Sequence, residues 1–476
     1  MRVEQDNLTR LYQPILLEKA LTIIHQPYPQ FTEDGPALQE DPLLSSQQAF
    51  QAFVNKLAQA CDSRPGGDTV TAVTILRDAD NFPWYVVACN FRSKEALQGT
   101  KAFLDSLLRM IRDEQDMGRR PLLKQILWQL LSFSFPRVKL YLNNLLSHLR
   151  ERAMFPRDIT NRNAKAKFLS DCETCINVIH GARGKEVDEA IRSQSRDNEM
   201  EIAQVWHELR HYLGRLLSYR QAAEILLGAF DRWPSLFRDF TIDTIPSNGR
   251  ASRPLPKSKL TAEEIIVNMS ENASEAKTYL QQAYDLQNMA LDERIQQQVE
   301  KSFRPVLHAE VALHEHLLRV GIEHPERYWN NNKYIGSSKP TFAVRAGHDN
   351  LYANWQFPPA PEQEGRMGLQ ANLELLGIIT VLVRNDAKRT LDERRPRGKR
   401  HDSNTASSMP AYFDLGSHGT SSQTSNSRRP DRDKGLQRKD GSGAYKGDDW
   451  DSYELIASGG DDEPGNDGAS ISGERY

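Results

Sequence analysis

Hydrophobic residues recur at three- and four-residue spacing through most of the chain between residues 93 and 303. Segments such as LLKQILWQLL, RVKLYLNNLLSHLRERA and MEIAQVWHELRHYLGRLL predict amphipathic helices that pack on one another. Pro136 separates the first two segments and, because proline donates no amide hydrogen, predicts a helix boundary there. Thr261 stands three residues before Glu264, which is the spacing of a capping box, and predicts the start of a helix that continues to about Lys301.

A different pattern occupies residues 69–88, TVTAVTILRDADNFPWYVVA. β-branched and aromatic residues flank an Asp-Ala-Asp-Asn turn, which predicts a β-hairpin with strands near Thr69–Leu76 and Trp84–Asn90. Residues 244–260 contain three prolines and two basic clusters and predict a linker. From residue 391 onward almost no branched apolar residues remain, which predicts a disordered tail.

These patterns predict an α+β fold, in which a mostly helical chain surrounds a small mixed sheet. We expect four parts along the chain. They are an N-terminal part with helices and the hairpin (1–92), a helical insertion that includes the linker (93–303), a C-terminal half of the sheet domain (304–390) and the tail (391–476).

Composition narrows the class of protein. The chain has 476 residues with Lys+Arg 61 and Asp+Glu 64, so it has no global basic surface of the kind that binds nucleic acid without specificity. Four cysteines are too few for a secreted disulfide framework, and the N-terminus lacks the pattern of a signal peptide. The longest apolar stretch, Leu375 to Val383, is too short to span a bilayer. We expect an intracellular, cytoplasmic protein that has no membrane partner.

A short basic run lies at the start of the predicted tail. Its composition is compatible with a nuclear address or a contact with a polyanion, although a solvated linker is the simpler interpretation. The run consists of Arg394, Arg395, Arg397, Lys399 and Arg400.

His308 and Glu310 form a His-x-Glu pair near the start of a helix predicted over Val306–Val320, just after Pro305. A histidine nitrogen at this place can bind a metal, and a carboxylate two residues later can move protons for a metal-bound water. The pair is the first half of the zinc deaminase signature, whose second half is PCxxC. Without further evidence, the simpler interpretation of His308 is a surface histidine on an amphipathic helix.

The residues that follow carry a more specific pattern, which consists of Tyr334-Ile335-Gly336, Ser338-Lys339-Pro340, Asn350-Leu351-Tyr352 and Asn354-Trp355. Together with His308-Ala309-Glu310, this pattern resembles the fungal deaminase-like family of the cytidine deaminase superfamily, which is related to bacterial nucleic-acid and nucleotide deaminase toxins. The resemblance covers residues 300–360 closely and the rest of the chain only in layout.

The resemblance implies a zinc cofactor with His308 as a ligand, Glu310 as the proton shuttle, and a nucleobase in nucleic acid or in a free nucleotide as the substrate. It also implies that the hairpin supplies the first two strands of a deaminase-like sheet. Residues 334–338 and 351–355 would add two further strands, the helix after His308 would cover the sheet, and residues 93–303 would be a helical insertion.

The chain departs from this family at the paired cysteine ligands. After Pro340 and Thr341, where the resemblance calls for cysteines at or near positions 342 and 345, the sequence reads Phe342-Ala343-Val344-Arg345. A zinc site has four ligands, and one imidazole supplies only one of them. A water that is not bound to zinc keeps a pKa of ~15.7. We therefore expect that zinc is not bound and that the enzyme is inactive in this form. The alternative is a helical scaffold that binds a protein partner through its helical body or its tail.

A CxxC motif could supply the missing thiolates. Cys172 and Cys175 lie on a helical pattern, so both sulfurs could face His308 if the fold brought the two segments together. Two thiols in the core of a helical protein are the simpler interpretation.

A second metal motif is the HELRH of residues 207–211, in which His207, Glu208 and His211 have the spacing of an HExxH metalloprotease. The longer metzincin pattern requires a third histidine where this chain has Leu217. The helix also carries an apolar stripe that must be buried, so a structural helix is the simpler interpretation.

Overall fold

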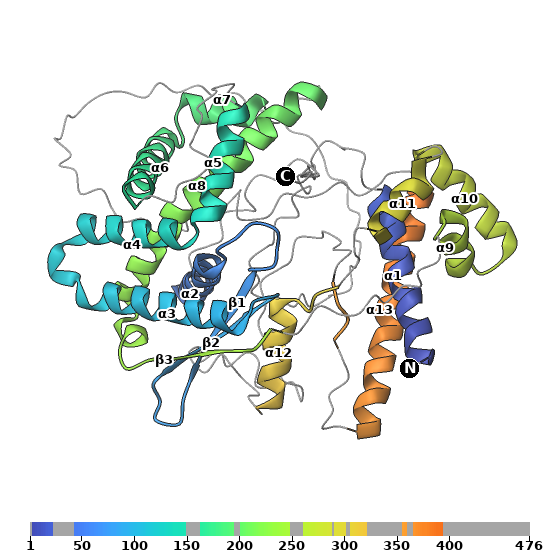
Figure 1. The fold of residues 1–476 in the computed structure, drawn as a ribbon, viewed down its shortest axis with the longest axis horizontal. Coiled ribbons are helices and arrows are strands. Elements are labelled where there is room, and N and C mark those ends of the chain that lie inside the picture. Colours follow the sequence, from blue (N-terminus) through green and yellow to red (C-terminus); the bar gives the residue numbers. More distant parts are fainter. Residues whose placement is uncertain are drawn as a thin grey trace, which may run out of the picture.

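The computed structural model describes residues 2–21, 42–148, 162–194, 200–247, 260–287, 290–300, 305–320, 355–358 and 365–393. In this part of the chain, helices surround a small mixed sheet, which confirms the predicted α+β class (Figure 1). All but one of the helices form two groups. One group packs around the sheet and the other packs around the N-terminal helix.

The predicted hairpin is present. Strands β1 (Thr71–Arg77) and β2 (Pro83–Cys89) pair antiparallel, with Thr71 opposite Cys89. The Oδ1 atom of Asp78 closes the turn by accepting hydrogen bonds from the backbone N–H groups of Asp80 and Phe82. This is the local bonding that an Asp-rich turn predicts.

A third strand was not predicted. Strand β3 (Thr241–Thr244) pairs parallel with β2, which makes β2 the central strand. The prediction of helices through most of residues 93–303 did not include this strand, and the linker predicted over 244–260 begins at the last residue of β3. Four residues are too short a pattern to be recognised as a strand from the sequence. The strand is stabilised by its pairing with β2 and by the burial of Ile242, and neither is visible in the local sequence.

The first group of helices covers one face of the sheet and encloses the largest core. Alternate residues of the hairpin, Val73, Ile75, Tyr85 and Val87, point into this core, as the two-residue period of a strand requires. The group consists of α2 (Pro42–Cys61), α3 (Lys94–Asp113), α4 (Arg119–Phe133), α5 (Phe135–His148), α6 (Arg162–Ala182), α7 (Glu186–Gln194) and α8 (Met200–Arg232), with short 3-10 helices η1 (Gln115–Met117) and η2 (Pro234–Phe237).

The boundary predicted at Pro136 is confirmed. α4 ends at Phe133 and α5 begins at Phe135, so Pro136 lies in the first turn of α5, where its missing N–H costs no helical hydrogen bond. The buried Ser134 lies between the two helices.

The opposite face of the sheet is covered by α12 (Ala309–Arg319), as we predicted for the helix after His308. Ala72, Leu76, Val86 and Ala88 of the hairpin pack against apolar residues of this helix. The helix begins three residues later than predicted, because Val306 instead forms a parallel β-bridge with Trp355.

The second group packs around α1 (Arg2–Leu21) and encloses a separate core. Its other members are α9 (Ala262–Met269), α10 (Ala273–Gln287), α11 (Leu291–Glu300) and α13 (Gly365–Glu393). α1 packs against α13, and the hairpin packs against the first group and against α12, so the first 92 residues contribute to three cores.

The helix start predicted at Thr261 is confirmed, because the Oγ1 atom of Thr261 accepts a hydrogen bond from the backbone N–H of Glu264 at 3.2 Å. The single helix predicted from there to about residue 301 is instead three helices, the first of which ends at Met269. α13 extends to Glu393 and buries Leu391, so the predicted tail begins three residues too early.

Several predicted features lie outside the described residues. These are the strand near 334–338, the segment 342–345, and residues 394–476 with their basic run. Of the strand predicted near 351–355 only Trp355 is described, and it forms an isolated bridge with Val306. Among the helices that are described, we find none with the length and apolar character needed to cross a membrane.

Candidate functional site

The helix that carries the His-x-Glu pair begins against the end of the hairpin. Asn90 directly follows β2, and its Oδ1 atom accepts a hydrogen bond from the backbone N–H of Ala309 at 2.7 Å. The Nδ2 atom of Asn90 donates to the carbonyl oxygen of Gly67 at 2.9 Å, which holds the side chain in place. The first N–H groups of a helix have no partner within the helix, so Asn90 satisfies one of them from outside.

His308 occupies the position just before α12. Its carbonyl oxygen accepts a hydrogen bond from the N–H of Ala312 at 3.0 Å, which is the first bond of the helix, and its side chain is half-buried. The pair therefore lies at the N-terminal end of α12, as the sequence predicted.

Glu310 is the second residue of α12 and its carboxyl group faces a poorly solvated environment. The Oε2 atom is buried and has no hydrogen-bond partner among the described residues. Burial raises the pKa of Glu310 to about 7, and a hydrogen bond from its own backbone N–H opposes this rise only in part. The N-terminus of a helix favours a negative charge, so desolvation outweighs the helix dipole here.

The next turns of α12 have the same electrostatic character. Burial lowers the pKa values of His314 and His316, and burial raises the pKa of Glu315. In each case the uncharged form is favoured, which is the effect of a low-dielectric environment on acids and bases alike.

A complete metal site is not present in the part of the chain that the structure describes. No three histidine, cysteine, aspartate or glutamate side chains converge there in a way that could hold a metal ion. The residues described around His308 therefore do not fit a zinc ion, which needs three or four protein ligands.

Cys172 and Cys175 do not join His308. They lie on α6 and belong to the core on the opposite face of the sheet, and α6 and α12 lie far apart in Figure 1. Burial raises the pKa of Cys172 to about 12 and also raises that of Cys175, so both thiols stay protonated at neutral pH. Protonated thiols bind zinc poorly, because the thiolate is the ligand.

The HELRH residues lie on α8, whose backbone places His207 and His211 one turn apart. The side chains of His207 and Glu208 lie outside the described residues. His211 is half-buried, and its ring centroid lies 5.1 Å from that of Tyr212. Leu209, Leu216 and Leu217 of the same helix are buried, so the apolar stripe of α8 is packed as the sequence required.

Sequence reasoning missed Asn90. The pattern placed Asn90 only as the last residue of a predicted strand, and its partner Ala309 lies 219 positions later. It also missed a pocket between α1, α9 and α13, because the residues that line it come from distant segments, none of which carries a motif.

No protein-family model, no curated protein and no solved structure matches the chain. The geometry defines a candidate site at the N-terminal end of a helix on a β-hairpin, with a buried carboxyl group that ionises near neutral pH.

Proposed function

We propose that the chain is a deaminase-like protein of the cytidine deaminase superfamily and that its present form is catalytically inactive. Glu310 carries the proposal. It combines a buried carboxyl oxygen that lacks a described partner with a pKa of about 7, in the first turn of a helix packed on a β-hairpin. A group that holds and releases a proton near neutral pH is what a general acid and base requires.

The proposed roles follow from position. Glu310 would be the proton shuttle and His308, two residues earlier, the remnant of a zinc site. Inactivity follows from the missing thiolates, because no other described side chains complete a ligand set around His308. No reaction step through zinc is proposed for this form.

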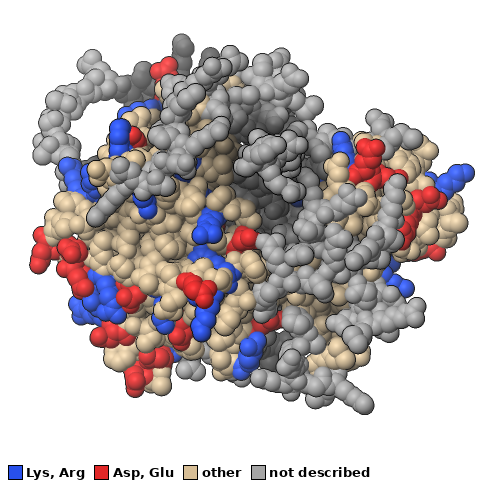
Figure 2. Space-filling view, viewed as in Figure 1, with Lys and Arg blue, Asp and Glu red and all other residues tan. Residues whose placement is uncertain are grey.

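The substrate of the ancestral activity would be a nucleobase in a nucleic acid or in a free nucleotide. On the face shown in Figure 2, Lys and Arg side chains of the described residues are intermixed with Asp and Glu side chains. That face therefore offers no support for an extended nucleic-acid backbone, which needs a continuous basic surface.

Zinc content and a grafted ligand set test the proposal. The purified full chain and its His308→Ala variant are expected to contain equally little zinc by elemental analysis. Neither protein should deaminate cytosine or adenine in single-stranded DNA, single-stranded RNA or free nucleotides above the level of Glu310→Gln. Stoichiometric zinc that disappears in His308→Ala would contradict the inactive assignment.

The family assignment is tested by inserting a helical PxCxxC segment between Thr341 and Phe342. The graft is expected to restore zinc binding that depends on His308 and turnover that depends on Glu310. A matched graft with PxSxxS controls for the insertion itself. A folded cysteine graft that binds no zinc would contradict the deaminase assignment.

The second candidate is a helical scaffold that binds a protein partner. One observation favours it, which is an apolar stripe on α13. Leu375, Ile378 and Leu382 are 44%, 60% and 59% exposed and lie at helical spacing. Contiguous exposed apolar side chains of this kind are typical of interaction surfaces.

The scaffold candidate predicts that one defined partner no longer binds the double variant Ile378→Ser/Leu382→Ser, or no longer binds a chain that ends at residue 393. The chain is cut at residue 393 because this leaves α13 intact. The same partner must be retained by Glu310→Gln and by Val187→Ser, which changes an exposed valine on α7. Equal capture by all variants would eliminate this candidate.

A further inference from the structure

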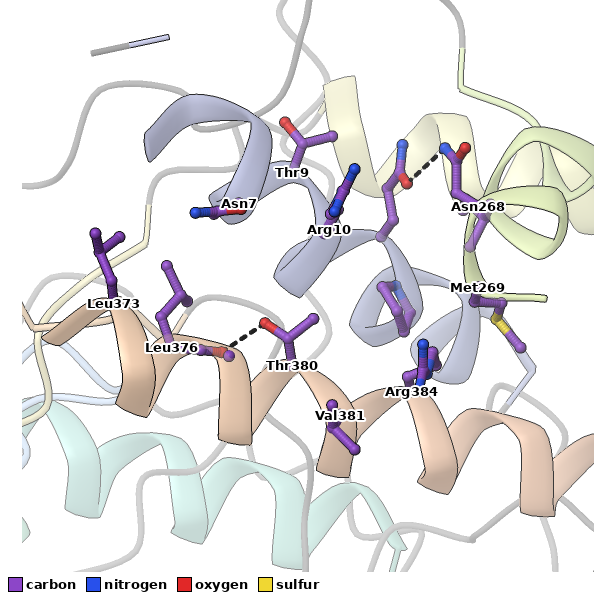
Figure 3. Close-up of a pocket in the computed structure, with 14 residues that line it drawn as sticks. Asn7, Thr9, Arg10, Asn268, Met269, Leu373, Leu376, Thr380, Val381 and Arg384 are labelled. Carbon is purple, nitrogen blue, oxygen red and sulfur yellow. Dashed lines mark hydrogen bonds between the residues drawn. The ribbon is translucent and has the colours of Figure 1, made fainter. Parts of the chain in front are cut away.

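A pocket of ≈ 610 Å³ lies between α1, α9 and α13 (Figure 3). None of its lining residues belongs to α12, so it is separate from the site at Glu310. Its volume is within the range of small-molecule sites, which is roughly 300–1,000 Å³. Nothing in the proposed deaminase-like function uses it.

The charged residues of this pocket have one sign. Arg10 of α1 and Arg384 of α13 both line it, and none of its lining residues in the described chain carries a carboxylate. A concave site with two positive charges and apolar walls concentrates anions, because the electrostatic potential is less screened there than on an open surface.

Arg384 provides the strongest indication of an anionic ligand. Its Nε atom is buried and has no hydrogen-bond partner among the described residues. Glu275, the carboxylate that Arg384 influences electrostatically, already accepts a hydrogen bond from Lys388 Nζ at 2.7 Å. A buried charged donor without an acceptor is unfavourable, and a bound anion would supply the acceptor.

Neutral polar groups beside the arginines are held in place. The Nδ2 atom of Asn268 donates to the Oε1 atom of Gln13 at 3.0 Å, and the hydroxyl of Thr380 donates to the carbonyl oxygen of Leu376 at 2.7 Å (Figure 3). This bond joins α1 to α9 and uses the Oε1 atom of Gln13 as the acceptor. The Nε2 atom of Gln13 carries the N–H groups that can donate to a ligand.

Apart from Asn7 and Thr9, the rest of the lining is apolar, and there is open space beside it. Ile265, Leu373 and Leu376 contribute aliphatic side chains. A Cβ atom added to Gly377 would meet nothing within 4 Å, so α13 leaves room at this position. The pocket thus offers a cationic region and an apolar region of the same cavity.

We propose that this pocket binds a small organic anion, specifically a phosphate monoester with an apolar body. The phosphate group contacts Arg10 and Arg384, and the apolar body packs against Ile265, Leu373 and Leu376. Guanidinium groups match phosphate oxygens with two parallel hydrogen bonds, which favours arginine at such a site.

Phenyl phosphate is the probe for this proposal, with phenol as the uncharged analogue and inorganic phosphate as the analogue without an apolar body. Calorimetric titration of the full chain is expected to give the tightest binding for phenyl phosphate. Arg384→Gln is expected to weaken that binding by about tenfold or more, since it removes a charge-assisted hydrogen bond. Arg389→Gln is the matched control, because Arg389 lies on the same helix but pairs with Asp386 outside the pocket.

A second variant tests the cavity without changing its charge. Gly377→Leu is expected to abolish phenyl phosphate binding by filling the pocket, and Gly99→Leu, at an exposed helical glycine with equally open surroundings, is expected to have no effect. The proposal is overturned if phenyl phosphate does not bind, or if Arg384→Gln and Gly377→Leu bind it as the parent does. Equal binding of phenol would overturn the anionic part, and equal binding of inorganic phosphate would overturn the apolar part.

Discussion

The side chain of Asn90 and the backbone N–H of Ala309 are joined by a hydrogen bond of 2.7 Å. This bond links the end of the hairpin to the first residue of α12, which follows 219 positions later. Asn90 and Ala309 are both buried, so water does not replace the bond readily. The bond fixes where α12 begins and therefore where Glu310 lies on the sheet.

Asn90→Ala is expected to lower the free energy of unfolding by about 1–2 kcal/mol, because it leaves a helix N–H unsatisfied and removes the bond to Gly67. Asn90→Asp retains the acceptor for Ala309 and should lose less. Urea denaturation measures the free energy, and hydrogen exchange of the α12 amides locates the loss. Equal stability of the alanine variant and the parent would show that the start of α12 is determined elsewhere.

Features that depend on neighbouring residues were predictable. The turn at Asp78, the helix cap at Thr261 and the boundary at Pro136 each arise from bonds or clashes within a few residues, and the sequence contains both partners. The predicted place of α12 over the hairpin came from the resemblance to a known family, not from periodicity.

Features that depend on distant partners were not predictable. β3 is stabilised by pairing with β2, about 150 residues earlier, and α1 packs with α13 at the other end of the described chain. Periodicity reveals that an apolar face must be buried, but it does not reveal which face buries it. The same reason explains why the partner of Asn90 and the two arginines of the pocket were missed.

The ionisation of Glu310 provides a second prediction. Its carboxyl carbon is expected to titrate in the folded protein with a midpoint at a pH of about 7, compared with the ordinary value of 4.5. Because burial raises the folded-state pKa, the folded state binds more protons than the unfolded state between these two pH values. Stability should therefore fall as pH rises from 4.5 to about 7 and level off above it.

Glu310→Gln should remove this part of the pH dependence and gain stability relative to the parent at pH 8, on the order of 1–3 kcal/mol. Glu18 is a necessary control, because burial also raises its pKa to about 7. The variant Glu18→Gln should show its own, separate loss of pH dependence. A ¹³C midpoint near 4.5 for Glu310 would contradict the proton-shuttle assignment directly.

A buried ion pair provides the third prediction. Arg137 and Asp62 form a salt bridge with side chains that are 6% and 2% exposed, and Asp62 also accepts a hydrogen bond from the hydroxyl of Thr69 at 2.6 Å. Asp62→Ala is expected to cost about 3–5 kcal/mol of folding stability, because it leaves a buried guanidinium without its carboxylate. Thermal and urea denaturation measure this loss.

The pair of Arg119 and Asp231 is the matched comparison, since its side chains are 41% and 47% exposed. Asp231→Ala should cost less than about 1 kcal/mol, because water replaces the lost partner. If the two aspartate variants lose similar stability, then burial does not decide the contribution of the pair in this protein.

The last prediction concerns the four thiols. Burial raises the pKa of Cys61 and Cys172 to about 12 and also raises those of Cys89 and Cys175. Since only the thiolate reacts with alkylating agents, iodoacetamide should label all four slowly in the native protein at pH 8 and rapidly in denaturant. Mass spectrometry of the labelled peptides measures each rate, with and without added zinc.

Because Cys172 and Cys175 lie in the core away from His308, zinc should not change their labelling. Selective protection of these two thiols by zinc, lost in His308→Ala, would mean that α6 and α12 share a metal site after all.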